Sequence, residues 1–493
     1  DKDGYAEIYV SRQLGVDTSA STVNVPTVVK TDASTELSDV VEIAAGMQQM
    51  SARVIEDASA DPFTKVYAWG NNSYGQLGLD KSDATYVYAT RVVGGETKKD
   101  YLEDTVSLYA GGYHMGSVQS DYSVWDWGYN INGQLGDGTT DRRKAPVKVV
   151  SDMGQPQLTI STATWTNNGV DNDVVIYYDT LKMQNTSKIV TSIQEGDILS
   201  IDLSGISGVS SFNLLRASAY TPDDLTFKSV DTEVATVDAK TGVVTAKKTG
   251  ITYIVVTDKN GAEGFFKLNV EPQGTNYIAY PQVQPGFYHT VALKADGTVW
   301  AWGDNSYGQL GIGVKGNPTD SSKTSCLTPM QVVTGEQDSS STYLEDIIQI
   351  SAGPTFAMAL DKKGNVYTWG LNNVGQLGNN TNTNSNAPVR VSGGLAYTVY
   401  LGDVIQIAAG GDWVNGTNDF AVVLRKDGSV MTWGQNSNGQ LGNKSYTSSL
   451  TPVRPVGLDG NTDKGLQNVV QITAGGVSAG VVTTDRKAYT WGY

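Results

Sequence analysis

The sequence predicts an all-β protein in which a ring of repeated sheets is interrupted by a second, smaller β domain. A ten-residue motif, Trp-Gly-x-Asn-x-x-Gly-Gln-Leu-Gly, occurs five times without a mismatch and begins at Trp69, Trp127, Trp302, Trp369 and Trp433. The 493 residues include 55 Gly and 26 Tyr, a composition that favours short strands and tight turns over helices. The first two copies are 58 residues apart and the second and third are 175 apart, so a small domain is expected in the longer interval.

Each repeat unit reads as four short strands. Residues 347–353 and their equivalents form an alternating apolar run that ends in small residues. A second run, 290–294, is joined to the run 298–302 by Asp296-Gly297, and this dipeptide between alternating runs predicts a tight hairpin. After the motif a fourth segment follows, such as 387–391. Four strands per unit with turns between them predict the blade of a β-propeller.

The invariant residues of the motif are best explained by packing. A Trp can fill the space between neighbouring units, the Gly after it permits close backbone approach, and the Asn suits a turn held by its own amide. A sixth Trp-Gly pair, Trp491-Gly492, lies next to the last residue of the sequence. We therefore assign a structural role, away from any ligand, to Trp69, Trp127, Trp302, Trp369, Trp433 and Trp491.

The motif, the unit opening and the period resemble the regulator-of-chromosome-condensation repeat. The resemblance covers most of residues 1–153 and 276–493, and it implies a propeller, which has seven blades in the best-known members. The sequence itself shows six unit openings and six Trp-Gly pairs, and residues 4–10 can supply one further strand. The expected fold is thus a six- or seven-bladed β-propeller.

The two ends of the chain are expected to complete one blade together. The last unit, 469–491, lacks its outer half, whereas residues 1–39 contain Arg12-Gln13-Leu14-Gly15, which matches the tail of the motif. Sharing a blade removes the exposed edge that an open sheet would present. The sequence therefore predicts that the second propeller part closes the ring with the N-terminal segment.

Residues 154–275 are predicted to form the inserted domain. Short β runs at 229–238, 242–246, 250–257 and 265–270 have the spacing of a β-sandwich. From Leu225 to Val270 the segment resembles the group 2 bacterial immunoglobulin-like domain. That resemblance implies a spacer or adhesive unit outside bacterial cells, and hence an extracellular protein, either secreted or on the cell surface.

The sequence offers little for catalysis. The only histidines, His114 and His289, occupy equivalent places in their units, and the resemblance implies that they hold backbone groups. Cys326 is the only cysteine and lies in a polar stretch without a nearby His. We expect no catalytic residue, no metal site and no cofactor. The formal charge of −16 disfavours nucleic acid as a partner, and no apolar run is long enough to insert into a membrane.

The expected function is that of a non-catalytic extracellular binding or structural module. Connections of unequal length, 79–104, 312–346 and 456–468, are candidate contact surfaces because recognition commonly resides in variable loops on rigid scaffolds. The residues proposed for binding are Tyr86, Tyr88, Tyr101, Tyr343 and Trp413. The partner would be a protein, a surface glycan, or other copies or modules of the same surface assembly.

Two alternatives follow from related propellers. One is a secreted inhibitor that binds an enzyme on one propeller face, as a family that sequesters β-lactamases does, and it requires aromatic residues concentrated on a single face. The other is a nucleotide-exchange factor for a small GTPase. The acidic charge and the bacterial type of insertion count against this second alternative.

Overall fold

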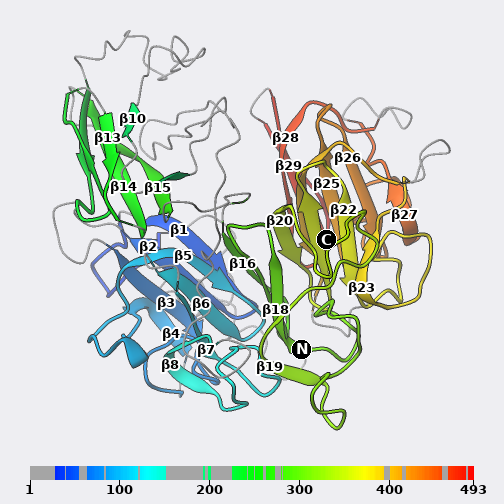
Figure 1. Ribbon diagram of the computed structural model, residues 1–493, viewed down its shortest axis with the longest axis horizontal. Coiled ribbons are helices and arrows are strands. Elements are labelled where there is room, and N and C mark those ends of the chain that lie inside the picture. The colour runs from blue at the N-terminus through cyan, green and yellow to red at the C-terminus, as the bar shows by residue number, and fades with distance from the viewer. Residues whose placement is uncertain are drawn as a thin grey trace.

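The computed structural model (Figure 1) describes most of the repeat units and part of the segment between them. The described residues are 28–38, 40–54, 64–82, 85–119, 123–150, 192–194, 198–200, 225–240, 243–248, 250–258, 263–271, 279, 281–393, 400–412, 418–457, 465–484 and 487–493. They contain thirty strands and a single 3₁₀ turn, η1 (Gly95–Thr97). The predicted all-β class is confirmed.

Six antiparallel sheets carry the repeat in the described part of the chain, and each follows the chain order of its strands. The first sheet comprises β1 (Val40–Ala45), β2 (Gln49–Val54), β3 (Lys65–Asn71) and β4 (Thr85–Arg91), and the second β5 (Thr105–Ala110), β6 (His114–Gln119), β7 (Val124–Gly128) and β8 (Arg143–Lys148). The third comprises β16 (Gln282–Pro285), β17 (His289–Leu293), β18 (Val299–Asp304) and β19 (Ser325–Gln331), and the fourth β20 (Ile347–Ala352), β21 (Phe356–Asp361), β22 (Val366–Gly370) and β23 (Ser385–Arg390). The fifth comprises β24 (Val404–Gly410), β25 (Phe420–Arg425), β26 (Val430–Gly434) and β27 (Ser449–Val453), and the sixth β28 (Val469–Ala474), β29 (Ser478–Thr483) and β30 (Ala488–Gly492).

Turn residues set the register within each sheet. Gly297 has a φ of 76°, and Thr298 donates its backbone N–H to the Asp296 carboxylate, which fixes the predicted hairpin between β17 and β18. Val291 then pairs with Ala301 across the two strands. Each third strand ends at the motif, where the register shifts and the chain turns toward the fourth strand.

The first strands of the six sheets surround one hollow of about 410 Å³. It is lined by the short connections between the first and second strands of all six sheets, including Gly46, Gly111, Gly286, Gly353, Gly410 and Gly475. We call the surface around this hollow the channel face. In Figure 1 the first and second sheets lie at the left, the fourth to sixth at the right, and the third between them. This arrangement is that of a propeller whose blades follow the order of the chain.

Neighbouring sheets are joined by two repeated contacts. Gln349 on β20 donates to the carbonyl of Ile407 and accepts from its N–H, so one amide links two first strands. Gln406 makes the same link to Ile472, and Gln282 donates to the Ile348 carbonyl and accepts from the Ile350 N–H. Farther out, the indole N–H of the motif Trp donates to the Gln carbonyl in the preceding motif. The pairs are Trp127 with Gln76, Trp302 with Gln134, Trp369 with Gln309, Trp433 with Gln376 and Trp491 with Gln440, at 2.8–3.0 Å.

The sixth sheet has three strands among the described residues. Of the N-terminal segment, residues 28–38 are described and lie against the first sheet, where the Lys30 carbonyl accepts from the Ala89 N–H and Leu37 packs near Trp69. Residues 1–27 lie outside the described part. The sharing of a blade by the two chain ends, and the choice between six and seven blades, therefore stay predictions.

The segment between β8 and β16 forms two small sheets in Figure 1. One has the order β10 (Ile198–Ser200), β13 (Val243–Ala246), β12 (Ala235–Val237). The other has the order β11 (Leu225–Ser229), β14 (Gly250–Asp258), β15 (Glu263–Glu271), β9 (Ser192–Gln194). The strand runs expected from 229 to 270 coincide with β12 to β15 within a few residues. Much of 154–275 lies outside the described residues, so its boundaries stay a prediction.

Candidate functional site

Two of the tyrosines proposed for binding belong to a repeated structural feature. Tyr101 and Tyr343 form isolated bridges with Val93 and Val333, and Tyr400 has the same place in the next unit. All three are about two-fifths exposed, at 40–43%. They lie in connections from a fourth strand to the next first strand, on the side of the sheets opposite the channel face.

The other proposed residues lie elsewhere. Tyr86 and Tyr88 are half-buried in β4, and Tyr86 packs against the cluster around Trp127. Trp413 lies outside the described residues. The structure thus places the described candidates in an outer strand and two separate connections, and it does not gather them into one surface.

A different set of rings gathers on the channel face. Tyr74, Tyr113, Tyr129, Phe287 and Tyr288, here called the aromatic cluster, come from the first, second and third sheets. Their centroids are 4.4–6.3 Å apart from one ring to the next, and most pairs meet edge to face. This is the geometry in which aromatic rings attract each other. All five rings are half-buried and so retain exposed surface.

The cluster is built from variable positions around the invariant motif. Tyr74 stands at the sixth motif position, where other units have Asn132, Tyr307, Val374 and Asn438. Tyr129 stands at the third position, where others have Asn71, Asp304, Leu371 and Gln435. Tyr113, Phe287 and Tyr288 come from the connections that follow β5 and β16. The sequence feature that could have predicted this cluster was therefore the set of variable residues within the motif, rather than the unequal loop lengths.

The invariant residues of the motif fix the backbone that carries these variable side chains. In the first unit Asn72 accepts the Leu77 N–H at 3.0 Å and donates to the Lys81 carbonyl, while Gln76 accepts the N–H of Tyr74 at 2.8 Å. The buried Leu77 anchors the turn from below. The tyrosine backbone is therefore fixed before any partner arrives.

A cation covers one end of the aromatic cluster. The exposed Arg142 places its guanidinium carbon 4.8 Å from the ring centre of Tyr74 and 5.2 Å from that of Tyr129. Burial, helped by the neighbouring hydroxyls, raises the pKa of Tyr113 and of Tyr288. Tyr113 and Tyr288 are therefore uncharged at neutral pH.

At its other end the cluster borders a hollow of about 240 Å³ between the third and fourth sheets. Phe287, Tyr288 and Tyr307 provide its aromatic walls, and Asp304 and Gln309 provide polar groups. Phe287 also lines the central hollow. Arginine, aromatic rings and a small polar hollow thus form one continuous strip on the channel face.

The histidines belong to the packed interior. His114 and His289 are fully buried, and a Cβ at Gly111 or Gly286 would lie within 2.2 Å of a ring atom. Burial lowers the pKa of His114 to about 4, and burial together with His114 lowers that of His289 to about 3. Contrary to the expectation, neither ring has a backbone hydrogen-bond partner among the described residues, and each packs closely against the glycine three positions before it. The nearest polar neighbour of His114 is the Thr290 hydroxyl, at 3.4 Å.

Other titratable groups are buried as well. Cys326 is 3% exposed, and burial raises the pKa of its thiol to about 11. Asp126 and Asp419 are fully buried, which raises the pKa of Asp126 well above its usual range and that of Asp419 to about 7. Within the described ranges no group of three or more His, Cys, Asp or Glu side chains has the arrangement of a metal site. Nor does that part of the chain contain a helix long and apolar enough to span a membrane.

Relatives of this chain differ widely in length. Protein pim1 of Schizosaccharomyces pombe is 24% identical over 446 residues, which cover 87% of this chain and 66% of the relative. The human probable E3 ubiquitin-protein ligase HERC3 is 34% identical over 205 residues, which cover 41% of this chain and 16% of the relative. The chain therefore spans less than two thirds of either relative.

Solved structures of propeller proteins also match. Human WBSCR16 matches with a TM-score of 0.49 and 15% identity, covering 90% of this chain and 72% of that one. Yeast RCC1 (Prp20) bound to Kap60 matches with a TM-score of 0.36 and 16% identity, covering 87% and 78%.

Family matches cover both parts of the predicted organisation. Residues 214–267 match the bacterial Ig-like domain (group 2), as the resemblance of 225–270 predicted. The regulator of chromosome condensation (RCC1) repeat matches residues 65–114, 122–164, 282–309, 296–360, 347–376, 363–414 and 427–481. These repeat matches cover more than half of the chain, which therefore belongs to the RCC1 repeat family.

Proposed function

We propose that this chain is a non-catalytic binding module that works outside a bacterial cell and takes a protein partner onto its channel face. The observation that supports this most is the aromatic cluster, because five half-exposed rings from three sheets meet on one face, two of them at variable positions of the motif and three in the connections after β5 and β16. Exposed aromatic surface at one place on a soluble protein is typical of an interaction site.

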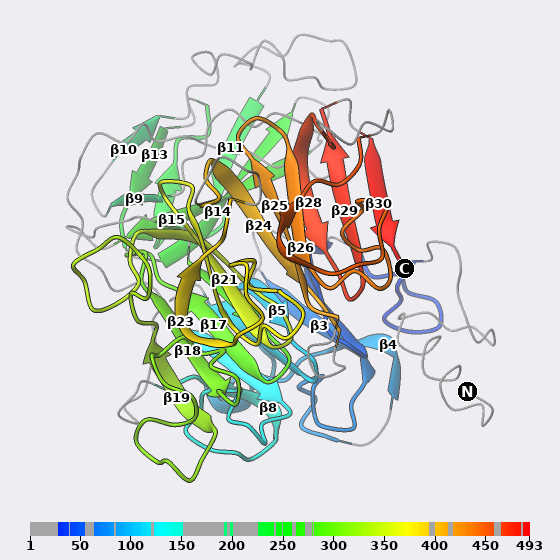
Figure 2. The same cartoon turned by 90° about the vertical axis from the view of Figure 1, so that its right-hand side faces the viewer.

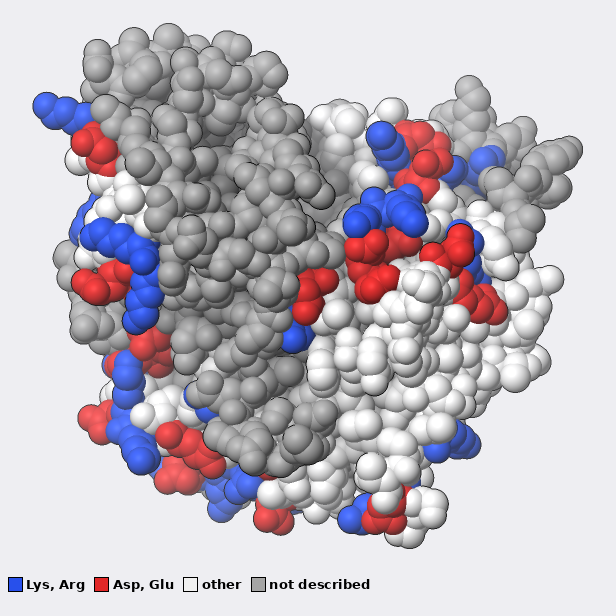
Figure 3. All heavy atoms as spheres, viewed as in Figure 1, with Lys and Arg blue, Asp and Glu red and all other residues white. Residues whose placement is uncertain are grey.

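The chemistry of the strip suits a protein contact. Tyr and Arg are enriched among the residues that dominate binding energy, and Tyr brings a large contact area with few rotatable bonds. Arg142 lies on the rings of Tyr74 and Tyr129, which limits the freedom that it would lose on binding. On the face drawn in Figure 3 the Lys and Arg side chains are interspersed with Asp and Glu. A mixed surface with a net charge of −16 favours a protein over a polyanion.

Two further observations support the non-catalytic and extracellular parts of the proposal. His114, His289 and Cys326, the side chains best suited to nucleophilic or acid–base work, are buried in the scaffold. The match of 214–267 to a bacterial Ig-like domain associates the chain with modules of bacterial surface proteins.

The test begins by identifying the partner from the cluster itself. A photo-crosslinking amino acid in place of Ile131, which is 55% exposed two residues from Tyr129, will mark the protein that contacts this surface. Affinity for the purified partner is then measured for Tyr129→Ala and Tyr113→Ala, with Tyr343→Ala on the opposite side as the control. We expect each cluster variant to lose about 2 kcal/mol, roughly thirtyfold in Kd, and the control to lose nothing. Weakening by Tyr343→Ala alone would place the contact on the other face.

The aromatic cluster also favours a second candidate, a protein inhibitor that covers an enzyme. Such an inhibitor needs aromatic residues concentrated on a single face, and the five rings fulfil this condition. If the crosslinked partner is an enzyme, its activity will fall with one equivalent of this protein, and Tyr129→Ala will restore it. Full activity in the saturated complex would leave a binding module without inhibition.

A further inference from the structure

The hollow at the end of the aromatic cluster has the size of one amino-acid side chain. Its volume of about 240 Å³ lies below the range of roughly 300–1,000 Å³ found for drug-sized ligands. Phe287, Tyr288 and Tyr307 surround it, while Asp304, Gln309 and Thr355 supply polar groups. A pocket beside a rim of aromatic rings is the usual place for an anchoring residue in a protein interface.

Asp304 is the only charged residue among those that line this hollow. It is 8% exposed, and its two oxygens accept hydrogen bonds from Ser306 and from the Gln309 amide, the latter at 2.7 Å. The carboxylate is therefore fixed in place beside the aromatic residues that line the hollow. On the fourth-sheet side, Thr355 donates to the buried Asp419. Arg142 lies at the other end of the strip, over Tyr74 and Tyr129.

A carboxylate and aromatic rings together select a cation. The face of an aromatic ring attracts positive charge, and the attraction grows where water is partly excluded. A carboxylate partner adds a charge-assisted hydrogen bond. We propose that the hollow beside Asp304 takes the side chain of a lysine or arginine from the protein partner. This inference rests on the proposed function and names the chemistry of the partner's anchoring residue.

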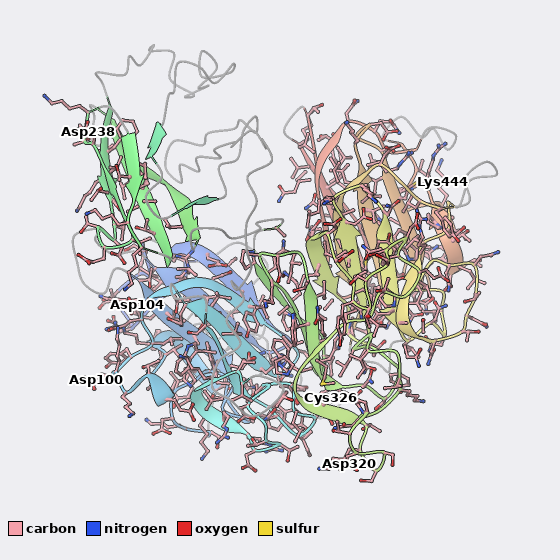
Figure 4. The ribbon with its side chains drawn as sticks, in the orientation of Figure 1. Asp100, Asp104, Asp238, Asp320, Cys326 and Lys444 are labelled. Carbon is pink, nitrogen blue, oxygen red and sulfur yellow. The ribbon has the colours of Figure 1, made fainter. Side chains whose placement is uncertain are left out.

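Another unit of the chain shows which substitution removes the charge of Asp304 and keeps the turn. Asn71 in the first sheet has the same motif position as Asp304, and its Oδ1 accepts from the Ser73 N–H and from the Gln76 amide. Asparagine is thus compatible with this turn, so Asp304→Asn is expected to keep the fold. Asp320→Asn is the matched control, because Asp320 is a half-exposed carboxylate at the outer tip of the connection between β18 and β19 (Figure 4) and does not line the hollow.

The inference is tested with short peptides. The probes are acetyl-Gly-Gly-X-Gly-Gly-amide with X as lysine, arginine, norleucine or glutamate, and binding to the full chain is followed by saturation-transfer NMR. We expect the lysine or arginine peptide to bind at least fivefold more tightly than the norleucine peptide. Asp304→Asn should abolish this preference, Asp320→Asn should keep it, and the glutamate peptide should bind worst.

Three results would contradict the proposal that a lysine or arginine side chain occupies the hollow. They are equal binding of the norleucine peptide and both basic peptides, tighter binding of the glutamate peptide than of the basic peptides, or an unchanged preference for basic peptides in Asp304→Asn. The purified partner separates this failure from failure of the proposed function. Loss of affinity in Tyr129→Ala, with none in Asp304→Asn, would keep the binding face and reject the anchor. Full affinity in both variants, and in Tyr113→Ala, would reject the binding face as well.

Discussion

The middle sheets and the end sheets of the series are made from the same repeat but differ in how completely they are joined. Trp369 is fully buried and donates to the Gln309 carbonyl, whereas Trp69, 2% exposed, has no acceptor for its indole N–H among the described residues. Ile350 is 1% exposed, whereas Ile43, at the same place on the first sheet, is 63% exposed.

The sixth sheet differs from the middle sheets in the exposure of its third strand. Every residue of β22 and β26 is buried, whereas β30 alternates between exposed and half-buried residues. Gln471, which corresponds to the linking Gln349 and Gln406, is exposed. Figure 2 shows the red strands β28–β30 on the same side of the molecule as the blue strands β3 and β4. The difference teaches that each unit is stabilised by packing and hydrogen bonds from the neighbouring units. The first and sixth sheets each lack such contacts on one side, and the other end of the chain or its flanking residues can provide them.

Removing a motif tryptophan gives the largest expected difference between the middle and the ends. Trp369→Ala should cost about 3–5 kcal/mol, because it removes a buried indole and leaves a cavity. Trp491→Ala should cost clearly less, since Trp491 is half-exposed on the edge strand β30. Chemical denaturation of both variants checks this. Equal losses would mean that the end seam is as tightly packed as the others.

Leucine truncation tests the closure of the ring. The motif leucines Leu77, Leu135, Leu310, Leu377 and Leu441 are all fully buried. If residues 12–15 act as the missing motif tail and supply the acceptor for Trp69, Leu14→Ala should cost about 2–5 kcal/mol, as Leu377→Ala should. The unfolding midpoints of the two variants give the comparison. A wild-type midpoint for Leu14→Ala would disprove closure through this segment.

The buried Asp126 predicts a dependence of stability on pH. Its carboxylate takes the place of Thr368 and Thr432 of other units, and the Tyr109 hydroxyl is the one polar group found beside it among the described residues, without the geometry of a good hydrogen bond. Because burial raises the pKa of Asp126, folding is favoured at low pH and this contribution is lost as the pH rises above the value for the unfolded chain. Asp126→Thr should therefore gain about 1–3 kcal/mol at pH 8, and the gain should shrink toward pH 4. Urea titrations at the two pH values measure it, and a gain that grows on acidification would contradict the sign.

The smallest expected effect concerns the glutamine links. Gln349→Ala removes both hydrogen bonds to Ile407 and should cost about 0.5–1.5 kcal/mol per bond. Gln471→Ala should be nearly neutral if the sixth sheet remains open. A cost similar to that of Gln349→Ala would indicate that Gln471 links to a further sheet in solution, and thus a closed ring.

The sequence was sufficient to predict the repeated four-stranded sheets because the same local turn and strand signals occur in several units. The Asp296-Gly297 hairpin and the Asn72 turn depend on neighbours within about ten residues, and both form as predicted. The aromatic cluster depends on which units become neighbours. Tyr113 and Phe287 meet at 5.8 Å although 174 residues separate them, and Tyr74 and Tyr129 stand at positions where the motif specifies nothing. The unequal loop lengths pointed to Tyr101 and Tyr343, which recur with Tyr400 in equivalent β-bridges, and their role in binding stays a prediction.

The long segment between β8 and β16 has a consequence for the order of assembly during synthesis. The other indole-to-carbonyl bonds connect residues 51–60 apart, whereas the bond from Trp302 to Gln134 spans 168 residues. A flexible loop of that length would add roughly 1 kcal/mol to the entropic cost of closure. The strands β11 to β15 pair locally, and their early folding shortens the effective loop. On the ribosome, the third sheet is therefore expected to dock on the second more readily once the intervening strands have folded.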